Sequence, residues 1–142
     1  MIKNLPYEII LEVKKRYMDI AITLPKKLWE KIVSGEKVYE LRKECPRRFT
    51  MGSNVVYVIL KGTKDVVGYF TVLSMSPVRI NDAVRCNNLI CADAGWIAKY
   101  LDYGNQKGYL WKVGDVNVFF PHSKNIVDLH LKSNPQSFCY IK

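Results

Sequence analysis

The apolar residues of this chain are gathered in short runs, and the length of these runs limits the folds that it can adopt. The run over residues 54–60 is among the longest. It has the length of a β-strand and is far below the roughly 20 residues of a membrane-spanning helix. Further strands are predicted over residues 18–24, 38–43 and 66–75. With 142 residues, 49% of them hydrophobic and 25% charged, the chain suits one soluble domain rich in strands.

Three other segments have helical patterns. Residues 5–16 combine an apolar side with cations at the C-terminal end, where they suit the helix dipole. A short helix is expected to begin at Pro25 and end at Gly35, because proline fits a first turn and glycine the left-handed position after the last. Residues 81–102 carry the third pattern. The remaining predicted strands are residues 109–113 and 116–120, on either side of Gly114 and Asp115, and residues 126–131.

The charge of the chain favours polyanionic partners. There are 22 Lys and Arg residues against 13 Asp and Glu, a net charge of +9. Excess positive charge promotes binding to nucleic acid through Coulomb attraction and counterion release, although it also fits a generally basic, soluble surface.

Neither a metal site nor export is expected. No two of the four cysteines have C-x-x-C spacing, and the chain has only two histidines, whereas zinc sites usually need close pairs of ligands. We therefore expect no metal and no cofactor. The first residues carry an acid and a proline where a signal peptide needs an apolar core, so the expected location is the cytoplasm, with reduced thiols.

The most informative motif follows the short helix. Residues 34–42 read Ser-Gly-Glu-Lys-Val-Tyr-Glu-Leu-Arg, with the form G-x-K-x-x-E-x-R, which resembles the signature of the ASCH domain family in the PUA-like superfamily. Residues 28–35, 52–58, 66–72 and 135–140 resemble further family elements in the expected order. The resemblance covers residues 18–142 and leaves residues 1–17 as an N-terminal helical extension.

The resemblance implies an α+β fold, a small PUA-like β-barrel with helices between the first strands and at the rim. It also implies nucleic-acid binding, with RNA favoured, in the regulation of transcription or RNA metabolism. The expected partner is RNA, another nucleic acid or a nucleotide-like small molecule held at the barrel mouth, and not a membrane. Because some family members hydrolyse acylated cytidine nucleosides and others cut RNA, an amidohydrolase or a ribonuclease is the alternative. The third alternative is a protein-interaction module in transcriptional regulation.

Strand alternation places Glu40 and Arg42 on the same face, where they can form an ion pair. The pair either anchors the strand at the barrel mouth or presents the guanidinium to a phosphate or base. Lys37 either points into the same mouth or lies in a solvated turn. In an enzyme, Lys37 and Glu40 would be the catalytic acid–base pair. The resemblance to the hydrolases implies a threonine three residues after the lysine, so Glu40 at that position argues against acyl transfer.

The loop after this strand adds cations and an aromatic residue, Phe49, which suits a phosphate backbone and a stacked base, although a solvated loop fits equally. In the C-terminal tail, Gln136 and Ser137 are candidates for reading base edges, and Phe138 is expected in the core rather than on a ligand. All three tryptophans are expected to be packing residues. The predicted nucleic-acid or ligand-binding residues are Lys37, Glu40, Arg42, Lys43, Arg47, Arg48, Gln136 and Ser137.

Overall fold

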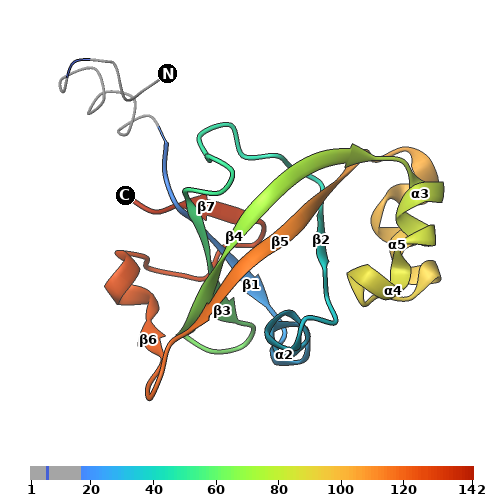
Figure 1. Cartoon of the computed structure of the whole chain (residues 1–142). Helices are drawn as coiled ribbons and strands as arrows, with labels where there is room; N and C mark the ends of the chain where they lie inside the picture. The colour runs from blue at the N-terminus through green and yellow to red at the C-terminus, as the bar shows by residue number, and fades with distance from the viewer. Residues whose placement is uncertain (1–5, 7–16) are drawn as a thin grey trace.

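The computed structural model describes residue 6 and residues 17–142, and its centre is a curled sheet with helices at one end and one side (Figure 1). The sheet has seven strands. The predicted helix over residues 5–16 lies outside the described residues. The strands are β1 (Ile20–Leu24), β2 (Tyr39–Arg42), β3 (Val55–Leu60), β4 (Asp65–Val78), β5 (Gly108–Val118), β6 (Lys124–Asn125) and β7 (Phe138–Tyr140).

The order of the strands leaves the barrel half open. Six of them follow the order β2-β5-β4-β3-β1-β7, and β6 pairs with β4. The pair β1–β3 is parallel, and the other pairs are antiparallel. Strands β2 and β7 are therefore the two edges of a sheet that curls without closing through backbone hydrogen bonds. The predicted α+β class is confirmed, with a half-barrel as its architecture.

Helix α2 (Lys26–Ser34) connects β1 to β2 and lies at one end of the curled sheet, next to β1 (Figure 1). It begins after Pro25 and ends at Gly35, whose φ of 87° is left-handed, as the sequence predicted. Its apolar side inserts Trp29 into the main core. The indole packs so closely on Gly68 of β4 that a Cβ there would lie 2.8 Å from a ring carbon, which only glycine avoids.

The remaining helices form a second group at the far end of β4 and β5 (Figure 1). The predicted helix over residues 81–102 is divided into α3 (Ile80–Arg85), α4 (Asn87–Ile90) and α5 (Ala94–Tyr100), followed by the 3-10 helix η2 (Asp102–Gly104). Helix α4 ends at Cys91, which has a left-handed φ of 61°. The three helices pack a second apolar core against Leu41 of β2 and Val78 of β4.

Two details of the predicted elements are wrong. The strands predicted over residues 109–113 and 116–120 are one strand, because β5 continues through Gly114 and Asp115. The glycine permits a close approach to β4, since a Cβ at this position would lie 2.5 Å from Oγ1 of Thr71. The predicted strand over residues 126–131 is instead the 3-10 helix η3 (Ile126–Leu129). A capping box between Asn125 and Asp128 satisfies its first backbone donors.

The tail and the aromatic residues complete the core. Part of the tail is strand β7, which pairs with β1 and places Phe138 against the main core, as expected. Phe49 is buried, so the prediction that it is available for stacking is wrong. Trp29 and Trp111 are packing residues, but Trp96 is 53% exposed and contradicts its predicted role. Within residues 17–142, no helix has the length and apolar character to cross a membrane.

Candidate functional site

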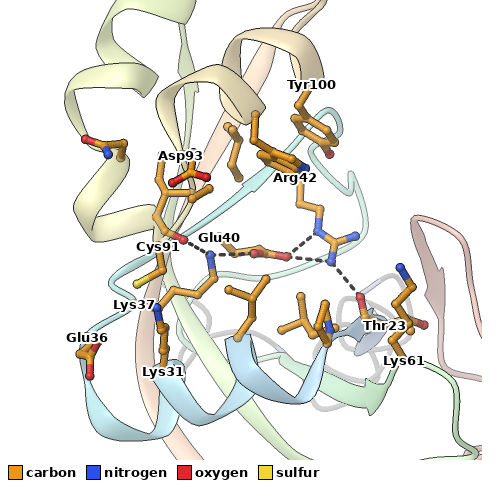
Figure 2. A pocket seen from close by; sticks show the side chains of 18 of the residues that line it. Thr23, Lys31, Glu36, Lys37, Glu40, Arg42, Lys61, Cys91, Asp93 and Tyr100 are labelled. Atoms are coloured by element: carbon orange, nitrogen blue, oxygen red, sulfur yellow. Dashed lines mark hydrogen bonds and ion pairs between the residues drawn. The ribbon is translucent and has the colours of Figure 1, made fainter.

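A groove of about 1010 Å³ lies between α2 and the group α4–α5, with β2 at its floor (Figure 2). Its far end is formed by the end of β1, by Lys61 after β3, and by Pro135 and Gln136 before β7. The groove therefore opens at the seam between the two edges of the half-barrel. The structure brings Lys37, Glu40, Arg42 and Gln136 of the predicted set to this one cavity.

The floor of the groove is a linear ion triad (Figure 2). Lys37 Nζ lies 3.1 Å from Glu40 Oε1, and Arg42 Nη2 lies 2.7 Å from Glu40 Oε2. Arg42 Nε donates a second hydrogen bond to the same Oε2 at 2.8 Å. The side chains of Lys37, Glu40 and Arg42 are 2%, 6% and 12% exposed. The predicted ion pair is thus one half of a buried cluster, and the alternative of a solvated Lys37 is wrong.

The spacing of the motif follows from the local backbone. The turn after Gly35 is fixed by hydrogen bonds from the N–H of Lys37 to Lys31 O at 3.0 Å and from Val38 N–H to Leu89 O at 2.8 Å. It delivers Lys37 to the start of β2. Alternation along β2 then places Glu40 and Arg42 on the groove side. The i, i+3, i+5 spacing consequently puts a carboxylate between two cations.

Lys37 joins β2 to α4. Besides Glu40, its ammonium donates to the carbonyl oxygens of Tyr39 at 2.9 Å and Ile90 at 2.6 Å. A lysine has three N–H donors, and each of them has an acceptor here. Lys37 could therefore act as a general base only by giving up one of these contacts.

Arg42 bridges the open seam of the half-barrel. Its Nη1 donates to Ser137 O, before β7, at 3.1 Å, and its Nη2 lies 3.4 Å from Thr23 O in β1. Together with the contacts to Glu40, these occupy four of the five guanidinium N–H donors, as far as the described residues show. The guanidinium also lies 5.9 Å from the centre of the Trp111 ring. Arg42 joins the two edges of the sheet, and one of its guanidinium donors has no acceptor among the described residues.

The triad holds an excess positive charge, because two cations share one carboxylate. Burial acts to raise the pKa of Glu40, but Arg42 and Lys37 more than offset it, and the pKa is lowered from its ordinary 4.5. Glu40 is thus a carboxylate at neutral pH. With one positive charge left over in a buried floor, the groove is suited to an anionic ligand.

The other predicted binding residues have different placements. Ser137 contributes its backbone carbonyl to Arg42 rather than its hydroxyl. Lys43 is outside the groove lining, but its Nζ lies 4.6 Å from the centre of the ring of Tyr100, which lines it. Arg47 and Arg48 belong to the exposed loop after β2, and neither is among the described residues that line the groove. The main-chain N–H of Arg48 donates to the hydroxyl of Tyr140.

Several lining residues were missed by sequence reasoning. The cations Lys31 and Lys61, the acid Asp93, and the aromatics Trp96 and Tyr100 all face the cavity. Lys31 and Lys61 stand in a helix and a turn with nothing to distinguish them from ordinary surface lysines. The i, i+4 spacing of Trp96 and Tyr100 is the one available signal in the sequence, but Trp96 is predicted there to be a packing residue and Tyr100 is assigned no role. No group of three metal-ligating side chains occurs in the part of the chain that the structure describes.

Comparison with solved structures identifies the fold. The chain is similar to the crystal structure of ASCH from Zymomonas mobilis, with a TM-score of 0.73, 19% identity and coverage of 88% of each chain. A serine-to-alanine mutant of the same protein gives a TM-score of 0.71, 17% identity, and coverage of 89% of this chain and 90% of the other. A tyrosine-to-phenylalanine mutant gives 0.69, 19%, and 88% and 91%. No family model and no curated protein matches the sequence. The chain therefore has the ASCH fold.

Proposed function

We propose that this protein binds single-stranded RNA by holding a nucleotide in the groove over β2, with the phosphate near Arg42 and Lys61. The observation that carries the proposal is the buried triad with its unbalanced positive charge at the floor of a cavity of about 1010 Å³. Such a floor favours a ligand that brings negative charge and planar polar groups together.

The charges around the groove support one orientation of that ligand. Lys61 lies at the end of the groove near Thr23, whereas Asp93 lies on the opposite wall, directly before α5 (Figure 2). A phosphate is attracted to the first end and repelled from the second. The exposed amide of Gln136 lies at the groove and can hydrogen-bond base or sugar groups. The net charge of +9 adds a general attraction to the RNA backbone.

A binding role fits the triad better than acid–base catalysis. Glu40 accepts from both cations, its pKa is lowered, and the ammonium of Lys37 has no donor to spare. A general base near neutral pH needs the opposite arrangement, a pKa close to the working pH and an open path to the substrate proton. Lys37 and Glu40 therefore serve to shape and charge the site.

The test is calorimetric titration with the four nucleoside 5′-monophosphates, the matching nucleosides and a single-stranded RNA. Lys61→Ala is expected to lower the affinity for the monophosphates several-fold, because it removes a phosphate contact. The affinity for the nucleosides should be unchanged. Lys64→Ala is the matched control, since Lys64 is exposed in the same turn but does not line the groove. Equal effects of the two substitutions, or no binding of any monophosphate at millimolar concentration, would overturn the proposal.

A further inference from the structure

Helix α5 presents a large aromatic surface to the groove. Trp96 lines the cavity and is 53% exposed, whereas Trp29 and Trp111 are 6% and 0% exposed. An indole of this exposure leaves a wide apolar face in water, which a folded domain ordinarily buries. The proposed binding of a phosphate assigns no role to this face.

The exposed indole is held in place rather than loose. Trp96 and Tyr100 are four residues apart on α5, and their rings stack with centroids 4.8 Å apart and planes 12° apart. Tyr100 is only partly exposed and has the ammonium of Lys43 4.6 Å from its ring centre. Burial raises the pKa of the Tyr100 phenol, so this supporting ring stays neutral. One face of the tryptophan is thus fixed against a second aromatic ring, and the other face is open.

We infer that the open face of Trp96 is the stacking site for the nucleobase of the bound nucleotide. The inference rests on the proposed function and adds the position of the base. A planar, uncharged heterocycle extends the existing stack of two rings by one layer and removes both apolar faces from water. Because Asp93 stands three residues before Trp96 on the same wall and repels phosphate, this wall of the groove takes the neutral part of the ligand.

The orientation of the whole ligand follows. The base lies against α5, the ribose crosses the floor above Arg42, and the phosphate lies toward Lys61. Stacking does not depend on the hydrogen-bonding pattern of the base, so the site is expected to accept all four bases, with purines binding best because of their larger rings. The ligand class is a purine-preferring nucleotide unit.

The experiment compares adenosine 5′-monophosphate with ribose 5-phosphate, which has the same sugar and charge but no base. The wild type should bind the nucleotide about 5- to 100-fold more tightly. Trp96→Ala should remove that advantage and leave ribose 5-phosphate unaffected. Trp96→Phe, which retains a smaller ring, should keep part of it. Tyr103→Ala is the matched control, since Tyr103 is 72% exposed just after α5 and does not line the groove.

Intrinsic fluorescence gives an independent readout, because Trp96 is the exposed one of the three tryptophans. Adenosine monophosphate should quench its emission, and ribose 5-phosphate should not. If Trp96→Ala leaves the ratio of the two affinities unchanged while both compounds still bind, the stacking inference is overturned and the phosphate site stands. If neither compound binds the wild type, the proposed function fails and the inference fails with it.

Discussion

The buried triad makes the substitution Glu40→Gln the sharpest perturbation of this protein. The change keeps the shape of the side chain and removes only its charge. In the wild type the carboxylate makes one contact to Lys37 at 3.1 Å and two to Arg42 at 2.7 and 2.8 Å. After the change, two buried cations share a neutral amide, and the NH₂ group of the amide faces one of them.

The magnitude follows from the burial of the three side chains. Breaking a buried ion pair by neutralising one partner costs about 3–5 kcal/mol, because the remaining charge is left without compensation. Lys37 is 2% exposed and Arg42 is 12% exposed, so water offers little relief. With an m-value of about 2 kcal/mol/M, this loss lowers the urea midpoint by about 1.5–2.5 M.

The double variant Glu40→Gln with Arg42→Met separates charge from packing. It removes one cation together with the anion, and Lys37 keeps the carbonyls of Tyr39 and Ile90 as acceptors. We expect the double variant to recover at least about half of the stability that Glu40→Gln loses, although the bridge to Thr23 and Ser137 is gone. Urea unfolding followed by circular dichroism measures all the variants.

Two results would refute this reasoning. A cost below about 1 kcal/mol for Glu40→Gln would mean that the two cations do not need the carboxylate. A double variant less stable than Glu40→Gln alone would mean that Arg42 contributes through its bridge across the seam and not through its charge.

Three further predictions concern pH, salt and turnover. Because the pKa of Glu40 is lowered from 4.5 in the folded state, its contribution to stability is present above about pH 4.5 and is lost as the pH falls below it. Unfolding free energies measured from pH 6 to 3 should therefore decline more steeply for the wild type than for Glu40→Gln. Replacing both Arg47 and Arg48 by alanine should flatten the salt dependence of binding to a long single-stranded RNA by up to about two counterions. The affinity for mononucleotides should stay unchanged, since both residues lie outside the groove lining. A weaker mononucleotide affinity in titrations would contradict this. Little or no hydrolysis of acylated cytidine is expected, because the ammonium of Lys37 is fully hydrogen-bonded. Turnover that Lys37→Ala abolishes, while the circular dichroism spectrum stays native, would establish the enzyme alternative.

The sequence predicted those elements whose signals are local. Pro25 and Gly35 bound α2 because proline and glycine have backbone preferences that the neighbouring chain rarely overrides. Alternation predicted which face of β2 carries Glu40 and Arg42. By contrast, Gly114 suggests a break between two strands, but the glycine is required inside β5 by the close approach of Thr71. A contact between residues far apart in the chain leaves no local trace.

In the candidate site, too, the part formed by neighbouring residues could be predicted, and the part assembled from distant segments could not. Its floor comes from one strand and the turn before it, so the G-x-K-x-x-E-x-R motif contained the whole triad. Its walls come from α2, α5 and the segment before β7, and only the fold brings these segments together. Trp96 shows the limit most clearly, because its spacing from Tyr100 predicts a shared helix side but not whether that side meets a core or a cavity.

The side chain of Arg42 determines how far apart the two edges of the sheet lie at the groove. Strands joined by backbone hydrogen bonds lie about 4.8 Å apart, too close for a nucleotide to pass between them. Here β2 faces β1 and the segment before β7 across the side chain of Arg42, which reaches Thr23 and Ser137 with its guanidinium. The width of the gap between β2 and β1 is therefore set by the length of the Arg42 side chain. A shorter residue at position 42 would lose the hydrogen bonds that join the two edges, whereas direct backbone pairing of β2 with β1 would close the groove at this end. One side chain therefore both holds the edges together and keeps the groove open.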